Sequence, residues 1–116
     1  MPTLYGIRSC DTVRRARRWL DGHGIAYTWH DLREDGLDAA QLQRWVDALG
    51  IDALLNRKSR TWRDLPSGRR ERLDDAGLQR LVLEHPTLLR RPLLEDGDEL
   101  AVGFSATDYA ARFDPE

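Results

Sequence analysis

The sequence contains a single cysteine, Cys10, among its 116 residues. One thiol cannot form an internal disulfide or a thiol-rich zinc site, so any disulfide must join Cys10 to another molecule. The histidines also lack the spacing of metal ligands; they are His23, His30 and His85. We therefore expect no structural metal and no bound cofactor.

Long apolar runs are missing as well. The runs present are far shorter than the roughly twenty apolar residues that a bilayer-spanning helix needs. The first residues resemble a strand and lack the charged region and apolar stretch of a secretory signal. We therefore expect a soluble, cytoplasmic protein without a membrane role.

The sequence has no large excess of charge of one sign. Its 18 Lys and Arg residues face 20 Asp and Glu residues, which gives a formal net charge of −2. Because phosphate neutralisation dominates nucleic-acid binding, this balance argues against a direct nucleic-acid partner. Arginines nevertheless cluster over 14–18 and again over 57–72. Such clusters are typical both of solvated helix faces and of surfaces that attract anions, and both interpretations stay open.

Hydrophobic spacing predicts a β-α-β unit at the start of the chain. Residues 2–7 suit a short strand, and 11–21 suit a helix with arginines opposite its apolar side. Residues 25–30 alternate like a second strand. Crossovers of this kind join parallel strands with right-handed connectivity.

The rest of the chain predicts helices, then a hairpin and a last helix. Asp38 caps a helix that Gly50 closes, short helices are expected over 70–73 and 76–84, and 51–56 is too short to assign. Segments 91–95 and 100–104 suit strands joined by a turn at 96–98, and Ser105 with Asp108 resembles a capping box.

This order predicts an α/β fold of the thioredoxin type. It has a four-stranded mixed sheet, flanking helices and a helical insertion over about 38–86, between the βαβ and ββα halves. The length fits one domain, 1–116. No long apolar stripe is left over for an interface, so we expect a monomer.

Cys10 stands between the first predicted strand and the first predicted helix. The N–H groups at a helix start carry partial positive charge and favour a thiolate, which is the reactive form of cysteine. The flanking residues Arg8, Ser9 and Thr12 are polar, although cysteine often simply fills space in a core. A lone thiol suggests a monothiol mechanism resolved by an external thiol. Ser9 and Thr12 are candidate hydrogen-bond donors to the thiolate and, equally, candidate helix caps.

Short motifs recur along the chain: Thr3-Leu4-Tyr5-Gly6-Ile7, Cys10-Asp11-Thr12, Arg18-Trp19-Leu20, Asp35-Gly36-Leu37, Leu54-Leu55-Asn56, Thr61-Trp62-Arg63, Arg91-Pro92-Leu93-Leu94 and Val102-Gly103-Phe104-Ser105. Their sequence and spacing resemble the ArsC/Spx family, most closely its YffB branch. The resemblance implies a thioredoxin fold and a glutathione-dependent thiol-disulfide oxidoreductase that is arsenate reductase-like and has the catalytic residue Cys10. It implies glutathione as co-substrate and glutaredoxin as a possible partner.

The same resemblance implies an anion site beside the cysteine. Arsenate reductases of the family hold an oxyanion with arginines, and Arg91 lies at one of these positions; Arg57 and Arg8 are weaker candidates. Pro92 matches the cis-proline that the fold places beside its thiol, where the backbone pairs with a bound sulfur compound such as glutathione. Ser9 and Thr12 are expected to contribute to that glutathione site.

The sequence departs from the arsenate reductase pattern at several positions. Asn56 and Gly103 stand where the family has arginines, and Gly6 stands where it tends to have a histidine. The alternative function is that of an Spx-like, non-catalytic regulator that binds RNA polymerase. Spx-like members often sense oxidation through Cys-x-x-Cys, and Val13 at the second position excludes that switch here.

Overall fold

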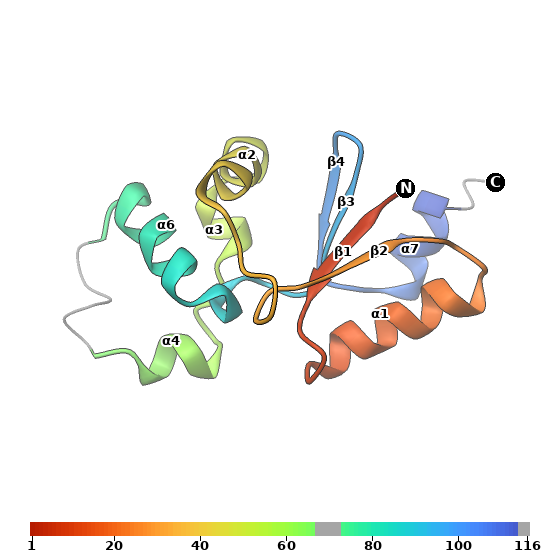
Figure 1. The fold of residues 1–116 in the computed structure, drawn as a ribbon, viewed down its shortest axis with the longest axis horizontal. Helices are drawn as coiled ribbons and strands as arrows, with labels where there is room; N and C mark the ends of the chain where they lie inside the picture. Colours follow the sequence, from red (N-terminus) through yellow and green to blue (C-terminus); the bar gives the residue numbers. More distant parts are fainter. Residues whose placement is uncertain (67–72, 114–116) are drawn as a thin grey trace. The chain divides into compact units, whose positions relative to one another are not determined.

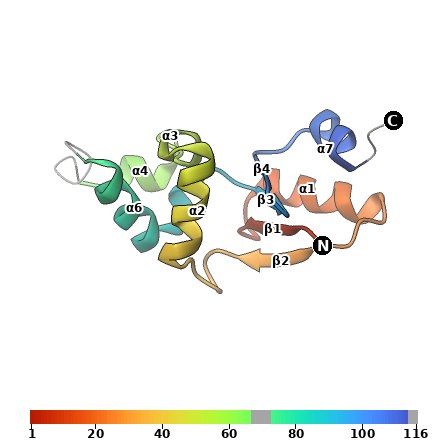
Figure 2. The same ribbon diagram turned by 90° about the horizontal axis from the view of Figure 1, so that it is seen from above.

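The computed structural model describes residues 1–66 and 73–113. They divide into two compact units, each of which is considered by itself: unit 1 is Met1–Asp31 with Arg91–Glu116, and unit 2 is Leu32–Arg90. Figures 1 and 2 show their elements. Unit 2 contains the predicted helical insertion, and a single domain over 1–116 stays a prediction.

Unit 1 is built on a four-stranded sheet with the order β2-β1-β3-β4. β1 pairs in parallel with β2 and antiparallel with β3, which pairs antiparallel with β4. The predicted mixed sheet of thioredoxin type is therefore confirmed. The strands are β1 (Thr3–Gly6), β2 (Thr28–Asp31), β3 (Leu93–Asp96) and β4 (Glu99–Val102).

β2 covers only the second half of the strand predicted over 25–30. The N–H of Ile25 donates to the carbonyl of Leu20 at 3.0 Å, so this residue still belongs to the helix end. The sheet ladder begins where β1 begins, because Thr3 is paired with Thr28. The alternating pattern therefore reflects a half-buried loop that runs into a short edge strand.

One side of the sheet packs against α1 (Asp11–Gly22) and α7 (Ala106–Phe113), as Figure 2 shows. Each fully buried leucine in such a core contributes roughly 1.5–3 kcal/mol to folding. The core of unit 1 is therefore the layer that fixes α1, and with it Cys10, on the sheet. Its buried residues come from β1, α1, β3, β4 and α7: Leu4, Ala16, Leu20, Leu94, Ala101 and Tyr109.

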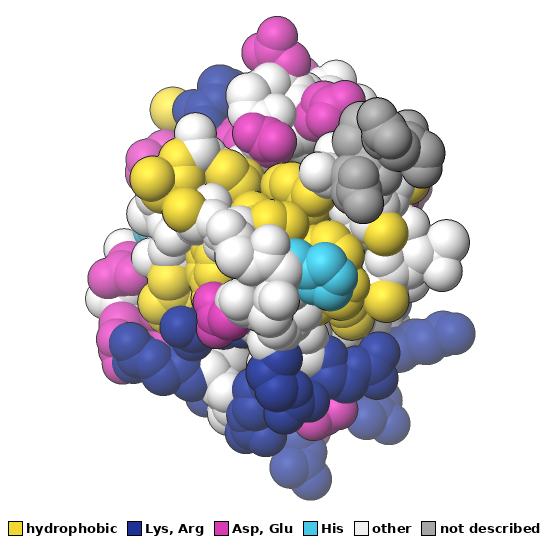
Figure 3. Space-filling view, turned by 90° about the vertical axis from the view of Figure 1, so that its right-hand side faces the viewer, with side chains coloured by type: hydrophobic (Ala, Val, Ile, Leu, Met, Phe, Trp, Pro, Cys, Tyr) yellow, Lys and Arg dark blue, Asp and Glu magenta, His cyan; other side chains and the backbone are white. Residues whose placement is uncertain are grey.

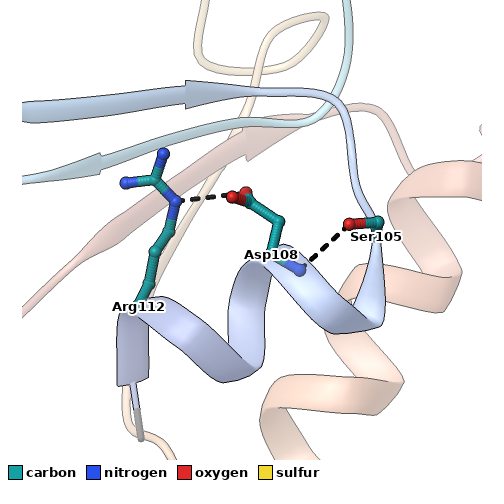
Figure 4. Close-up of polar contacts among 3 residues, drawn as sticks. All are labelled: Ser105, Asp108 and Arg112. Carbon is teal, nitrogen blue, oxygen red and sulfur yellow. Dashed lines mark hydrogen bonds and ion pairs between the residues drawn. The ribbon is translucent and has the colours of Figure 1, made fainter. Parts of the chain in front are cut away.

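The start of α7 confirms half of the predicted capping box. The hydroxyl of Ser105 accepts a hydrogen bond from the N–H of Asp108 at 3.0 Å. The carboxylate of Asp108 accepts one from Arg112 at 3.1 Å instead of reaching back to the start of the helix (Figure 4). An i, i+4 ion pair thus replaces the second contact of the box.

Unit 2 is helical in its described part. Its capped helix forms as predicted, since Asp38 accepts from the N–H of Gln41 at 2.7 Å and Gly50 follows the helix with a φ of 83°. The unassigned segment forms a short helix, and the helix predicted over 70–73 lies outside the described residues except for Leu73. The elements are α2 (Ala39–Leu49), α3 (Ile51–Leu54), α4 (Arg60–Asp64), α6 (Asp75–Glu84) and the 3-10 helix η1 (Pro86–Leu88).

Within 1–66 and 73–113, every helix is too short or too polar to cross a membrane.

Candidate functional site

Cys10 occupies the N-cap position of α1. Its backbone is extended, with φ −82° and ψ 123°, and its carbonyl accepts from the N–H of Arg14 at 3.0 Å. Its own N–H donates to the carbonyl of Ile7 at 3.2 Å, which closes a tight loop after β1. The thiol is partly exposed. The chain therefore turns from strand to helix at Cys10, as predicted, and solvent reaches the side chain.

No side chain caps α1 in the described part of the chain. Ser9 and Thr12 make no side-chain hydrogen bond there, so the alternative in which they cap the helix is not the one that the structure has. The first N–H groups of a helix have no partner within the helix and carry partial positive charge. The start of α1 therefore presents donors beside Cys10 that no side chain of the described residues occupies.

Arg14 fixes the loop that precedes Cys10. Its Nε donates to the carbonyl of Arg8 at 3.0 Å, and its Nη2 donates to the carbonyl of Ser9 at 3.3 Å. Hydrogen bonds from a charged guanidinium are stronger than neutral ones. Sequence reasoning missed this role, because a helical arginine that bonds two preceding loop carbonyls leaves no motif of its own.

Arg91 and Pro92 lie at the end of the sheet that carries the cysteine loop. The Arg91–Pro92 peptide bond is cis. The β1/β3 register pairs Tyr5 with Leu93, so the residue after Tyr5 continues opposite Pro92. The carbonyl of Pro92 accepts from the N–H of Gly103 at 2.8 Å, which ties the start of β3 to the end of β4. Unit 1 thus brings Cys10 and the Arg91-Pro92 segment to the same end of one sheet.

Two glycines at this end disfavour larger residues, one through a neighbouring side chain and the other through its backbone conformation. A Cβ on Gly6 would lie 2.8 Å from Cγ2 of Val13, closer than non-bonded carbons approach. Gly103 has a φ of 84°, a conformation that strains any residue with a side chain. A histidine at position 6 would therefore clash with Val13, and an arginine at position 103 would be held in a strained backbone conformation.

The candidate Arg57 and the neighbouring Asn56 lie in unit 2 and have contacts of their own. Arg57 belongs to unit 2, where its Nη1 lies 3.0 Å from Oδ1 of Asp52 and its guanidinium 5.7 Å from the ring centroid of Trp62. Asn56 accepts from the N–H of Lys58 at 3.0 Å and so stabilises a turn. Unit 1 contains the candidates Arg8, Cys10 and Arg91, whose segments lie at the same end of the sheet.

A metal centre is not visible in the described part of the chain. No group of three or more His, Cys, Asp or Glu side chains there is arranged to hold a metal ion. The groups available for chemistry at the sheet end are a thiol, hydroxyls, backbone N–H groups and guanidinium groups. This set suits nucleophilic attack and anion binding.

The mixed four-stranded sheet, with a cysteine at the start of its first helix, places this chain in the class of thioredoxin-fold proteins. Residues 5–112 match the model of the ArsC family, and the chain belongs to that family.

The similar proteins include two solved structures and a transcriptional regulator. A solved structure of a YffB protein is 41% identical, has a TM-score of 0.91 and covers 96% of this chain and 97% of its own. A solved structure of an arsenate reductase (ArsC) related protein from Brucella melitensis is 43% identical, with a TM-score of 0.77 and coverage of 97% and 94%. The global transcriptional regulator Spx of Bacillus subtilis is 32% identical over 99% of this chain and 88% of its own length.

Proposed function

We propose that this protein is a thiol-disulfide oxidoreductase in which Cys10 is the only nucleophile and glutathione resolves the product. The observation that carries this proposal is the partly exposed thiol at an uncapped helix start. The sequence offers no second cysteine as an internal resolving thiol. The resolving thiol must then come from solution. The proposal includes a monomer that works in the cytoplasm, where glutathione and glutaredoxin are its reductants.

The reaction proceeds in two exchanges. The Cys10 thiolate attacks the glutathione sulfur of a glutathionylated thiol, so a new disulfide forms at Cys10 while the substrate leaves as a thiolate and takes up a proton. A second glutathione, as its thiolate, then attacks the sulfur of the bound glutathione. This step breaks the Cys10 disulfide, releases oxidised glutathione and regenerates the Cys10 thiolate.

The neighbouring residues have binding roles in this proposal. Arg91 pairs with a carboxylate of glutathione or with an oxyanion through its planar guanidinium. The backbone next to Pro92 pairs with the bound sulfur compound. Ser9 and Thr12 donate to the thiolate, a role that their lack of a capping contact leaves open to them. Arg8 adds positive charge from the same loop.

Arsenate is expected to be the poorer substrate. An arsenate reductase-related protein is 43% identical to this chain, which supports a test of that oxyanion. Asn56 and Gly103, however, supply no guanidinium at two positions where arsenate reductases have one. Arg91 is the single arginine of the family pattern that remains, so arsenate reduction should be much slower than reduction of a glutathionylated disulfide.

The test is a pair of assays on the full chain, one with a glutathionylated peptide and one with arsenate, each with millimolar glutathione. We expect oxidised glutathione to accumulate with the peptide and the Cys10→Ser variant to form none above background. Absence of turnover with both substrates would overturn the proposal.

The second candidate function is that of a regulator that binds RNA polymerase. It is favoured by the 32% identity to the regulator Spx over almost the whole chain. Val13 excludes a Cys-x-x-Cys switch, so such binding would not depend on an internal disulfide. A pull-down with RNA polymerase separates the two functions. Binding that survives Cys10→Ser, in a protein without reductase activity, would favour the regulator.

A further inference from the structure

The outer face of α1 carries a group of arginines without acidic partners. Arg14, Arg15 and Arg18 are exposed and Arg17 is half-buried. None of the four forms an ion pair with another described residue. Residues three and four apart lie on one side of a helix, so these side chains form a continuous surface. We call it the α1 arginine face; Figure 3 shows Lys and Arg side chains gathered where α1 lies, along the lower part of the view.

The acidic residues of α1 do not neutralise this face. The helix contains Asp11 in its first turn and Asp21 in its last, and four arginines lie between them. Neither aspartate pairs with an arginine of the face within the described residues. A local excess of positive charge therefore persists in a chain whose net charge is −2.

Contacts with rings, a hydroxyl and carbonyls hold three of the four arginines, Arg14, Arg15 and Arg17. The guanidinium of Arg17 lies 4.2 Å from the ring centroid of Trp29, and its Nε donates to the hydroxyl of Tyr27 at 3.1 Å. The guanidinium of Arg15 lies 5.9 Å from the centroid of Phe104. Cation–π and carbonyl contacts fix a side chain without cancelling its charge. Binding of an anionic partner would then cost less side-chain entropy than binding by mobile arginines.

An open hollow of about 440 Å³ adjoins this face at Arg17. Besides Arg17, its lining includes Met1, Ile25, Tyr27, Trp29 and Asp21. The indole Nε1 of Trp29 is buried and has no hydrogen-bond partner among the described residues. The side chains of Met1, Ile25, Tyr27 and Trp29 thus offer apolar contacts to one side chain of a partner, beside the charged groups of Arg17 and Asp21.

We propose that the α1 arginine face binds an acidic segment of a protein partner, with carboxylates on Arg14, Arg15 and Arg18 and one apolar side chain in the hollow. Charge complementarity selects an acidic occupant. The formal net charge of −2 favours a polypeptide over a nucleic acid, because nucleic-acid binding depends on the neutralisation of many phosphates.

The α1 arginine face begins beside the reactive end of the helix. A helix rises 1.5 Å per residue, so Arg14 and Arg18 lie roughly 6 and 12 Å along the axis from Cys10. A docked partner would be held near the thiol. The binding itself needs no chemistry at Cys10, so it goes beyond the proposed function and can be tested separately.

The test is an NMR titration of the ¹⁵N-labelled full chain with a glutamate-rich peptide that contains one leucine. We expect the amides of 14–18 and the indole N–H of Trp29 to shift, and the affinity to fall with added salt. A peptide with glutamine in place of every glutamate should produce no shifts. The Cys10→Ser variant should bind the acidic peptide as the unmodified chain does.

A matched pair of variants separates this surface from an effect of net charge. Arg15→Glu with Arg18→Glu should weaken peptide binding at least tenfold, while circular dichroism verifies that both variants fold. Arg63→Glu with Arg80→Glu makes the same charge change at exposed positions of α4 and α6 and should leave the affinity unchanged. Equal losses in both variants, absence of shifts in α1, or tighter binding of a single-stranded oligonucleotide than of the peptide would each overturn the proposal.

Discussion

Replacement of Tyr109 by phenylalanine tests the core that supports α1. The side chain is fully buried, and its hydroxyl has no hydrogen-bond partner among the described residues. Its ring lies 4.8 Å from Phe104, 5.7 Å from Trp19 and 6.0 Å from Phe113, centroid to centroid. Tyr109→Phe keeps these contacts and removes only the hydroxyl. A buried polar group without a partner costs about 1–3 kcal/mol. We therefore expect the free energy of unfolding at pH 7 to rise by roughly 1 kcal/mol.

The same variant has an expected pH signature. Burial raises the pKa of Tyr109 well above its usual range, and the negative charge of Asp108 adds to the shift. In the unfolded chain a tyrosine ionises near pH 10. Above that pH the folded state keeps a proton that the unfolded state releases, so stability falls as the pH rises. The slope for one such group is about 1.4 kcal/mol per pH unit, and phenylalanine abolishes it.

The assay is urea unfolding of both proteins at pH 7, 10 and 11, followed by circular dichroism. The other tyrosines are common to both proteins, so the difference in unfolding free energy isolates Tyr109. This difference should widen in favour of the variant between pH 10 and 11. A variant that is less stable at pH 7 by more than about 1 kcal/mol would show that the hydroxyl has a hydrogen-bond partner and refute the reasoning. A difference that does not change with pH would refute the assigned effect of burial.

Three further substitutions probe the end of the sheet that carries Cys10. Gly6→Ala places a Cβ 2.8 Å from Val13 and should lower the free energy of unfolding in urea by about 1–3 kcal/mol. The double variant Gly6→Ala with Val13→Ala should recover part of this loss. A double variant as unstable as Gly6→Ala would argue against the clash. Gly103→Ala, at a φ of 84°, should cost about 1–2 kcal/mol in the same measurement, whereas an unchanged midpoint would show that the backbone relaxes. Arg91→Ala should raise the KM for a glutathionylated peptide by roughly tenfold, because a charged contact with the substrate is lost. A KM equal to that of the unmodified chain would show that Arg91 does not bind the substrate.

Local signals in the sequence predicted the elements whose ends depend on a few neighbouring residues. Asp38 and Gly50 mark the two ends of α2, because a carboxylate cap and a residue with positive φ are both local requirements. The hairpin turn after β3 follows from Gly97 in the same way, with its φ of 61°. The position of Cys10 between strand and helix was also readable.

Contacts between distant residues were not readable in this way. The start of β2 is set by pairing of Thr28 with Thr3, so the alternation of the preceding residues extended the predicted strand too far. The requirement for glycine at Gly6 comes from Val13 in α1, and the fixing of the cysteine loop comes from Arg14. Each depends on how α1 lies against β1, which no local pattern specifies.

Intact-mass measurement of the Cys10 adduct tests the central claim most directly. The full chain is mixed with a glutathionylated peptide without free glutathione, then treated with glutathione. The account predicts that the protein gains the mass of one glutathionyl group on Cys10 and that glutathione removes it with release of oxidised glutathione. A protein that gains no glutathionyl group, or that keeps it in the presence of glutathione, would contradict the account.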